Sequence, residues 1–286
     1  MEPTVRKAEP YTPPPVANAP FGNPAIWPKN APQIKAESAI LIDARSGEVL
    51  FQKNADTRRQ VASTQKLLTA LLVARRGNLD QPVTIARPET LAEPIKLYLK
   101  VGDRYPRRQL LEAIMVKSAN DACAALARDH SGSETAFARQ MNATATSLGA
   151  TSSLFANSNG LPAAQYSTAR DMARIAYHAY RNPVLREMMR KQESRFRHNN
   201  GKVTRLEATN LLLAASPEYT GMKTGYTNAA GRCLVSSGKM NGREVILVQL
   251  GSKTKYIFAD ASKTMHWAPP ASFFFARQSA VGDTAL

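Results

Sequence analysis

The sequence predicts an α+β domain in which both ends of the chain build one antiparallel sheet and a helical segment is inserted between them. Strand-like runs with turn signals lie near the start, at 38–52, and near the end, at 231–251. Between them, apolar residues recur at the three- and four-residue spacing of amphipathic helices. This order of elements favours separate sheet and helix layers over alternating βαβ units.

The strand predictions depend on short turns. Residues 38–52 form two short strand-like runs around a glycine-containing turn at 45–47. Residues 231–251 form two longer runs around an Asn-Gly turn at 241–242. Asn-Gly between apolar runs is a strong hairpin signal, and a short glycine-containing loop is another, so both regions are expected to form hairpins.

Helices are predicted by periodicity together with start and stop signals. Thr168 and Asp171 resemble a capping box, while Gly149 and the pair Asn182-Pro183 are expected to end helices. The expected helices span 65–76, 106–117, 119–130, 133–148, 167–181 and 258–268.

The chain divides by composition into three parts. Half of its 18 prolines fall within the first 32 residues, so 1–34 is expected to be an extended leader in which Phe21 and Trp27 are candidates for docking. Residues 35–270 form the predicted domain, with a helical subdomain at about 80–165. Residues 271–286 are left as a tail.

The net charge of +16 and the pI of about 10.1 predict attraction to anionic surfaces, including wall polymers and lipid head groups. The basic residues are scattered, without a long tract or an RNA-stacking motif, so we expect solvated faces and no nucleic-acid partner. No apolar run is long enough for a membrane span. The first residues also lack a secretory h-region, so the signal was removed or the protein is not exported.

Other chemistries find little support in the sequence. Cys123 and Cys233 are expected to be buried free thiols, with one disulfide left open should their segments meet. The four histidines lack metal-ligand spacing, and there is no HExxH or GxSxG motif. We therefore expect no metal site and no cofactor.

Ser63-Thr64-Gln65-Lys66 is an SxxK element at the start of a predicted amphipathic helix. A spacing of three residues puts the serine and lysine on one helix face. A lysine activates a serine hydroxyl only when its amine is neutral, which burial and the helix N-terminus both favour. Alone the motif is weak, because an N-capping serine with a surface lysine has the same spacing.

Two further triplets strengthen the SxxK element. Ser118-Ala119-Asn120 lies between two predicted helices, and Lys223-Thr224-Gly225 opens the late strand region. SxxK, a Ser-x-Asn triplet and KTG, in that order, are the set found in serine β-lactamases and penicillin-binding proteins. Their joint occurrence in the matching contexts of helix start, inter-helix loop and strand is a specific signal.

From about Ser38 to Trp267 the chain resembles the D-alanyl-D-alanine carboxypeptidases, which are low-molecular-mass penicillin-binding proteins. The stretches SANDACAALA, FANSNGLP with YSTARDMA, and GMKTGYTNAAGRCLVSS also read like that family. The resemblance implies a three-layer β-lactamase/DD-peptidase-like fold, an antiparallel sheet flanked by helices with an inserted all-helical subdomain. It also implies a periplasmic or extracellular location, peptidoglycan stem peptides as substrates, and β-lactam antibiotics as ligands.

Roles for the first two motifs are implied by the resemblance. Ser63 would attack the carbonyl of the penultimate D-alanine, and Lys66 would take its proton. Ser118 would relay a proton to the leaving amine, while Asn120 would hold Lys66 and a substrate amide.

The third motif would bind the substrate. Lys223 would add positive charge, Thr224 would meet the terminal carboxylate, and Gly225 would let the peptide lie along the strand edge. The backbone N–H groups of Ser63 and Tyr226 would form the oxyanion hole.

Three alternatives stay open at this stage. Phe258 stands where the carboxypeptidase branch has a basic residue, a pattern closer to the related D-alanyl-D-alanine endopeptidases that cleave peptidoglycan cross-links. A β-lactamase shares the motifs but needs a second base, and no Glu-x-x-x-Asn signature is found. A non-catalytic basic module that binds cell wall or nucleic acid would explain the charge of +16 alone.

Overall fold

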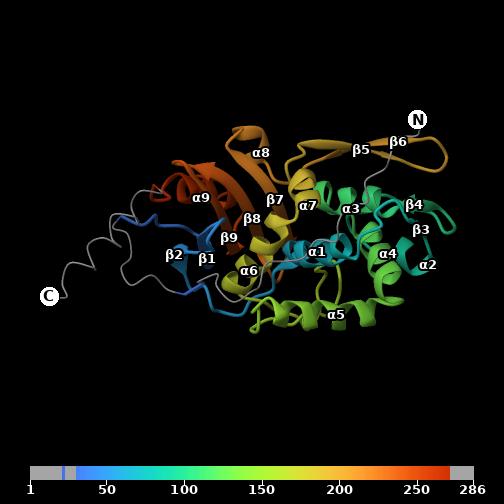
Figure 1. The fold of residues 1–286 in the computed structure, drawn as a ribbon, viewed down its shortest axis with the longest axis horizontal. Helices are drawn as coiled ribbons and strands as arrows, with labels where there is room; N and C mark the ends of the chain where they lie inside the picture. Colours follow the sequence, from blue (N-terminus) through green and yellow to red (C-terminus); the bar gives the residue numbers. More distant parts are fainter. Residues whose placement is uncertain (1–20, 23–29, 271–286) are drawn as a thin grey trace, which may run out of the picture.

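The structure is a computed structural model that describes residues 21–22 and 30–270. Strands from both ends of the chain form one antiparallel sheet in the order β2-β1-β9-β8-β7, as Figure 1 shows. The α+β class predicted from the sequence is therefore confirmed. The sheet strands are β1 (Ser38–Asp43), β2 (Val49–Lys53), β7 (Tyr219–Thr227), β8 (Gly231–Met240) and β9 (Arg243–Ser252).

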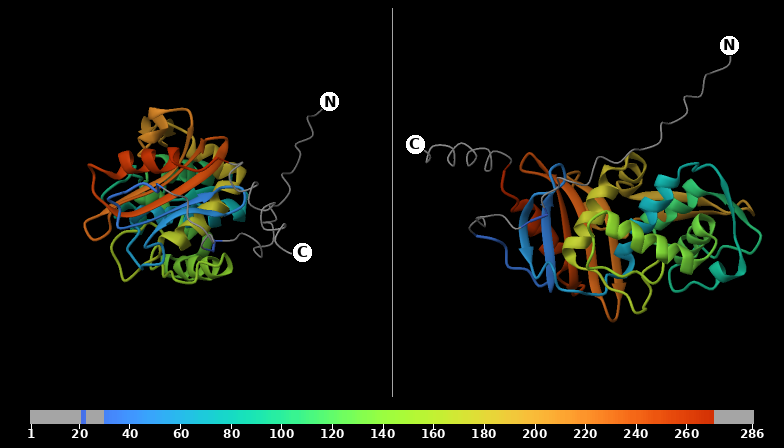
Figure 2. Two further views of the ribbon diagram at one scale, coloured as in Figure 1. Left: turned by 90° about the vertical axis from the view of Figure 1, so that its left-hand side faces the viewer. Right: turned by 60° about the horizontal axis from the view of Figure 1, so that its bottom comes forward.

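Helices cover both faces of this sheet and make three layers (Figure 2). Helix α9 (Ile257–His266) packs on one face over β8 and β9, whereas α6 (Ala169–Arg181) packs on the other, over β1 and β9, beside α1 (Lys66–Arg76). In β1, Leu41 belongs to the core under α9, while its neighbour Ile40 belongs to the core shared with α1 and α6. Burial on both faces explains why these strands are apolar almost throughout.

The helical segment lies between α1 and α6 in the chain. Its helices α3, α4 and α5 pack on one another in sequence, and α1 contacts all three. Gly149 has φ +76 just after α5, as expected of a helix stop. The elements are β3 (Pro82–Thr84), α2 (Arg87–Thr90), β4 (Arg104–Pro106), α3 (Arg107–Val116), α4 (Asn120–Ser131) and α5 (Glu134–Ser147).

Sequence reasoning missed a hairpin in the basic stretch after α6. Its strand β5 buries Ser194 and Phe196 and exposes Glu193, Arg195 and Arg197, an alternation hidden by the arginines. Asn182 ends α6 as predicted, but its side chain also accepts from the Leu185 N–H and caps the next helix. The elements between α6 and β7, which the sequence did not predict, are α7 (Pro183–Met189), β5 (Glu193–Arg197), β6 (Val203–Glu207) and α8 (Leu212–Ala215).

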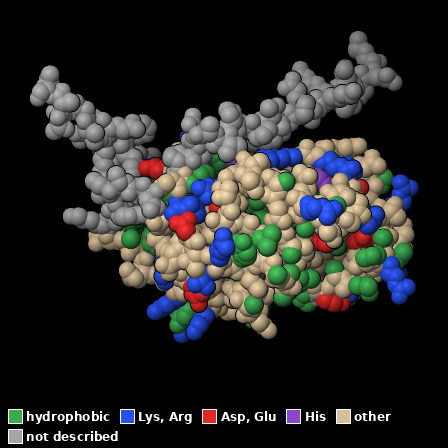
Figure 3. Space-filling view, turned by 90° about the horizontal axis from the view of Figure 1, so that it is seen from below, with side chains coloured by type: hydrophobic (Ala, Val, Ile, Leu, Met, Phe, Trp, Pro, Cys, Tyr) green, Lys and Arg blue, Asp and Glu red, His purple; other side chains and the backbone are tan. Residues whose placement is uncertain are grey.

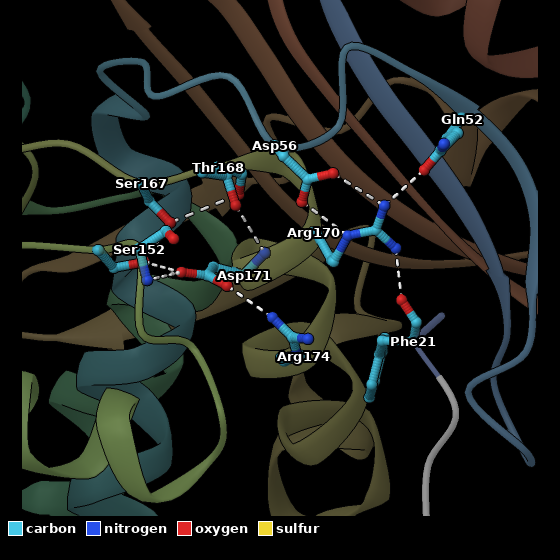
Figure 4. Close-up of polar contacts among 10 residues, drawn as sticks. Phe21, Gln52, Asp56, Ser152, Ser167, Thr168, Arg170, Asp171 and Arg174 are labelled. Atoms are coloured by element: carbon cyan, nitrogen blue, oxygen red, sulfur yellow. Dashed lines mark hydrogen bonds and ion pairs between the residues drawn. The ribbon is translucent and has the colours of Figure 1, made fainter. Parts of the chain in front are cut away.

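The predicted capping box at α6 is half formed. The Thr168 hydroxyl accepts from the Asp171 N–H at 3.0 Å, as expected of an N-cap. The Asp171 carboxylate does not reach back to Thr168. It accepts instead from the Ser152 N–H at 2.7 Å and from Arg174 at 2.8 Å, so it ties α6 to the preceding loop (Figure 4).

Phe21 docks on α6, as Figure 4 shows. It is buried, and its ring meets Tyr177 edge-on at 5.7 Å between centroids. Its backbone carbonyl accepts a hydrogen bond from Arg170, whose guanidinium also pairs with the Asp56 carboxylate at 2.7 Å and 3.0 Å. The second candidate for docking, Trp27, lies outside the described residues, as does the predicted tail.

Lys and Arg side chains are spread over the face drawn in Figure 3 among acidic and apolar ones. This distribution agrees with the prediction of solvated charge. Among the described residues, no helix has the length and apolar character needed to cross a bilayer. Cys123 and Cys233 are both buried and free, which decides between the thiol and disulfide alternatives.

Candidate active site

Ser63 and Lys66 meet at the start of α1. Ser63 lies in a 3₁₀ turn, Ala62–Gln65, and Lys66 is the first residue of the α-helix that follows. Ala62, just before the serine, has φ +48, an uncommon conformation for a residue with a side chain. This geometry leaves 2.7 Å between Lys66 Nζ and Ser63 Oγ.

The Lys66 amine is fully buried and has three oxygen partners. Besides Ser63 Oγ, it donates to Asn120 Oδ1 at 2.7 Å and to the Asn159 carbonyl at 2.8 Å. None of the described carboxylates forms an ion pair with it. Burial therefore lowers the pKa of Lys66 from 10.5 to about 8, so that a useful fraction is neutral near pH 7.

The middle motif lies opposite, in the loop between α3 and α4. Ser118 has φ +68, and its buried Oγ has no hydrogen-bond partner among the described residues. Asn120 begins α4 and is held by two backbone contacts: its N–H donates to the Ile95 carbonyl at 2.7 Å and its Nδ2 to the Glu93 carbonyl at 2.8 Å. Its Oδ1 is thereby aimed at Lys66. A positive φ at a residue with a side chain, as at Ser118, is a strained conformation that is found most often at functional sites.

Strand β7 brings the third motif to the same place. Lys223 is fully buried and donates to the Thr224 carbonyl at 2.9 Å. Burial, and then the nearby charge of Lys66, hold the pKa of Lys223 well below its usual 10.5. The direction of this shift works against the positive charge that the resemblance implies for Lys223.

Glycines let two other segments approach the Ser63 turn. A Cβ on Gly225 would lie 2.8 Å from the Ser63 backbone N and 3.0 Å from Ala62 Cβ. A Cβ on Gly160, which has φ +82, would lie 2.1 Å from the Ala62 carbonyl oxygen. Gly225 is therefore required for packing of β7 against the turn, a reason that the sequence had not suggested.

A pocket of about 440 Å³ opens beside Ser63. Lys66, Asn120 and Lys223 are buried and do not line it, but each contacts or adjoins a residue that does or another site residue. Five of the eight predicted site residues line the pocket, namely Ser63, Ser118, Thr224, Gly225 and Tyr226. The structure therefore brings all eight residues, from three separate parts of the chain, into one site.

A sequence profile of the D-alanyl-D-alanine carboxypeptidase family, peptidase S11, matches residues 27–254. The chain belongs to this family. It is 32% identical over 269 residues to a D-alanyl-D-alanine endopeptidase of Pseudomonas aeruginosa, covering 92% of this chain and 84% of that one. It is 36% identical over 249 residues to the D-alanyl-D-alanine carboxypeptidase DacA of Escherichia coli, covering 82% of this chain but only 61% of that relative.

The fold is also that of solved family structures. The Streptomyces K15 DD-transpeptidase superposes with a TM-score of 0.78 at 32% identity, covering 84% of this chain and 98% of that one. The β-lactamase/DD-peptidase-like architecture implied by the sequence motifs is thus confirmed.

Some residues of the site were not singled out from the sequence. The Asn159 carbonyl accepts from Lys66 and, at 3.2 Å, from Ser63 Oγ, and Thr209 Oγ1 accepts from Thr224 Oγ1 at 2.6 Å. The role of a backbone carbonyl cannot be predicted from residue type, because every residue has one. The stretch around Asn159 nevertheless resembled the family. Arg232 also lines the pocket, and its place depends on strand register alone.

Proposed function

We propose that this chain is a serine D-alanyl-D-alanine carboxypeptidase that removes the terminal D-alanine from peptidoglycan stem peptides through an acyl-enzyme on Ser63. The observation that carries the proposal is the 2.7 Å contact between Ser63 Oγ and the Lys66 amine, which burial brings to a pKa of about 8. A serine hydroxyl beside an amine that is partly neutral at pH 7 has the nucleophile and base needed for acyl transfer.

The acylation step uses both side chains. Ser63 Oγ attacks the carbonyl carbon of the penultimate D-alanine and passes its proton to the neutral Lys66 Nζ. The resulting ammonium has three acceptors in place, one being Ser63 Oγ itself and the others Asn120 Oδ1 and the Asn159 carbonyl. These preorganised acceptors stabilise the charge as it forms, which is where electrostatic catalysis is largest.

The leaving amine needs a proton, and Ser118 is placed to relay one. Its Oγ is buried beside the pocket and has no partner among the described residues that would compete for it. Lys223 acts on this step only through the electrostatics of the buried site, since its amine donates to the Thr224 carbonyl and makes no hydrogen bond to Ser118. The backbone N–H groups of Ser63 and Tyr226 stabilise the oxyanion, each contributing about 3 kcal/mol in typical cases.

The substrate peptide lies along β7 in this proposal. Thr224 lines the pocket, and its hydroxyl would turn from Thr209 Oγ1, its partner in this structure, to donate to the substrate, while Gly225 keeps the strand close to Ser63. An extended peptide pairing with a strand edge gains main-chain hydrogen bonds with little demand on its own side chains.

A D-alanyl-D-alanine endopeptidase is the second candidate. Phe258 lines the pocket at the start of α9, where the carboxypeptidase branch has a basic residue. The chain also covers 84% of the Pseudomonas endopeptidase but about three fifths of the DacA carboxypeptidase. Both activities use the same acyl-enzyme chemistry and differ in the leaving group.

A peptidoglycan substrate supports a location in the periplasm or outside the cell, because peptidoglycan is found there. Its net charge of +16 further favours peripheral association with anionic wall or membrane surfaces. Such association would weaken as ionic strength rises, because exposed charges are screened.

Labelling with a fluorescent penicillin tests the nucleophile. Wild type and the matched control Ser147→Ala, a change at an exposed serine in α5, should become labelled, whereas Ser63→Ala should not. Equal labelling of Ser63→Ala would refute the proposal. Digestion of purified wall fragments then separates the two activities: free D-alanine identifies a carboxypeptidase and separated peptide strands an endopeptidase.

A further inference from the structure

The outer face of the β5–β6 hairpin is strongly basic. Alternation along both strands turns Phe196 and Leu206 toward the protein and leaves the residues on the other face exposed. The register places Arg195 directly opposite Arg205. Like charges that face each other across two strands destabilise a hairpin, so fold stability does not account for this pair. The exposed cations of the hairpin and its turn are Arg195, Arg197, Lys202 and Arg205.

One of these four cations is neutralised locally and three are not. Arg205 lies 2.5 Å from a carboxylate oxygen of Glu193 and 3.9 Å from one of Glu207. The cations that pair with no described carboxylate are Arg195, Arg197 and Lys202. These three charges are free to attract an anion from outside the protein.

The hairpin holds its charges on a rigid support. The Phe196 ring packs on Tyr105 of β4 with 5.0 Å between the ring centroids, and Gln109 Nε2 of α3 donates to the Arg197 carbonyl at 2.9 Å. Both strands also contact α3, and Figure 1 shows the hairpin running alongside that helix. Because the backbone is already fixed, binding an anion here costs only the ordering of exposed side chains.

The hairpin also leads to the pocket beside Ser63. Strand β6 ends at Glu207, and Leu211 lines the pocket shortly afterwards in the chain. At about 3.3 Å per residue, the cross-strand pair of Arg197 and Val203 lies roughly 13 Å beyond that end of β6. A polymer that has one side peptide in the pocket is therefore close enough to place a neighbouring side peptide on the hairpin.

We propose that the outer face of the β5–β6 hairpin binds the carboxylates of neighbouring stem peptides on the peptidoglycan strand that supplies the substrate. This inference rests on the proposed peptidase function and adds a second contact, outside the pocket and separate from the chemistry. Stem peptides end in a free carboxylate, and the planar fork of an arginine matches a carboxylate in bidentate geometry. The hairpin retains the enzyme on the wall strand between turnovers.

The composition of this face favours a wall strand over a membrane or a nucleic acid. Among the described residues of the hairpin, Val203 is the one large apolar side chain that is exposed, and no Phe, Tyr or Trp is exposed with it. Binding in a membrane interface depends on inserted apolar side chains, and binding of single-stranded nucleic acid depends on stacking against aromatic rings. The face offers charge alone, which suits a hydrated polymer that carries carboxylates.

The test measures co-sedimentation of the whole chain with purified peptidoglycan sacculi, after acylation by penicillin has closed the pocket. Arg195→Gln/Arg197→Gln should bind roughly 3- to 30-fold more weakly than wild type, the factor for losing two exposed ion pairs. The control Arg139→Gln/Lys263→Gln, which removes the same charge from exposed sites on α5 and α9, should bind as wild type does. Penicillin labelling should be normal in both variants, because neither touches the active site.

A second ligand tests the chemistry of the contact. Sacculi whose carboxylates have been converted to neutral amides should bind wild type and the hairpin variant equally, and a difference that persists there overturns the proposal. Hairpin and control variants that bind untreated sacculi equally well also overturn it. So does a loss of binding to phosphatidylglycerol vesicles or to single-stranded DNA that exceeds the loss on sacculi. Absence of penicillin labelling in wild type refutes the peptidase function instead.

Discussion

The burial of Lys66 predicts a specific dependence of acylation on pH. With its ordinary pKa of 10.5, only about 0.03% of the amine would be neutral at pH 7, whereas a pKa of about 8 leaves about 10% neutral. Burial therefore raises the concentration of the active base about 300-fold at pH 7. Because the neutral form is the base, the rate must increase with pH and level off above about pH 8.

The assay measures the rate of Ser63 acylation by a fluorescent penicillin between pH 6 and pH 10. The rate should increase about tenfold from pH 7 to the plateau, as the neutral fraction goes from about 10% to nearly all. The charge of Lys66 helps to lower the pKa of Lys223, so the titrations of the two amines are linked and the midpoint belongs to the pair. Lys66→Arg, which keeps the charge but cannot lose its proton, should reduce the rate by about 10²- to 10⁴-fold at every pH.

Lys263→Gln, at an exposed position on α9, serves as the control and should keep the wild-type profile. A rate that is flat from pH 6 to pH 10, or one with a midpoint near 10.5, would refute the assignment of Lys66 as a base activated by burial.

Three substitutions test other parts of the structure. Gly225→Ala puts a Cβ at 2.8 Å from the Ser63 backbone N, so penicillin acylation should slow by about 100-fold or more, and Tm should fall by a few degrees because overpacking costs about 1–3 kcal/mol. Arg170→Gln removes the ion pair that lowers the pKa of Asp56. That pair stabilises the folded state above about pH 4 and is lost as the pH falls and Asp56 is protonated, so the difference in Tm between the variant and wild type should become smaller from pH 6 to pH 3. The Asp121 carboxylate accepts from the backbone N–H groups of Leu97 and Leu99 in the 94–99 loop. Asp121→Asn should weaken this anchoring, so KM for the peptide should increase severalfold.

Each of these predictions has a clear contrary result. Normal acylation by Gly225→Ala would show that β7 does not need to lie so close to the nucleophile turn. A Tm difference for Arg170→Gln that stays constant down to pH 3 would show that the Asp56 ion pair adds nothing to stability. An unchanged KM for Asp121→Asn, with unchanged kcat, would show that the loop keeps its place without the carboxylate.

The helices that the sequence predicted are those whose formation depends on residues close together in the chain. Helix α1 follows from leucines at helical spacing, and α6 from the Thr168 cap, whose hydrogen bond the structure contains. The β5–β6 hairpin was missed because its alternation rests on Ser194 and Phe196 within a run of arginines. Long-range packing, which the sequence pattern does not report, decided that these two residues are buried.

The sequence by itself predicted the eight residues of the candidate site and the type of chemistry they support, through three short motifs and the family resemblance that these motifs carry. Short motifs can be identified this way because side-chain type and spacing along the chain are local properties. Only the tertiary structure decided that the Lys66 amine is buried among oxygens from three segments, because burial depends on what packs against a residue. The same holds for Gly225, which touches a turn 162 positions earlier in the chain, and for Arg232, whose place in the pocket comes from pairing with Tyr226. Contacts between distant segments set pKa values and pocket shape, and they exist only once the chain has folded.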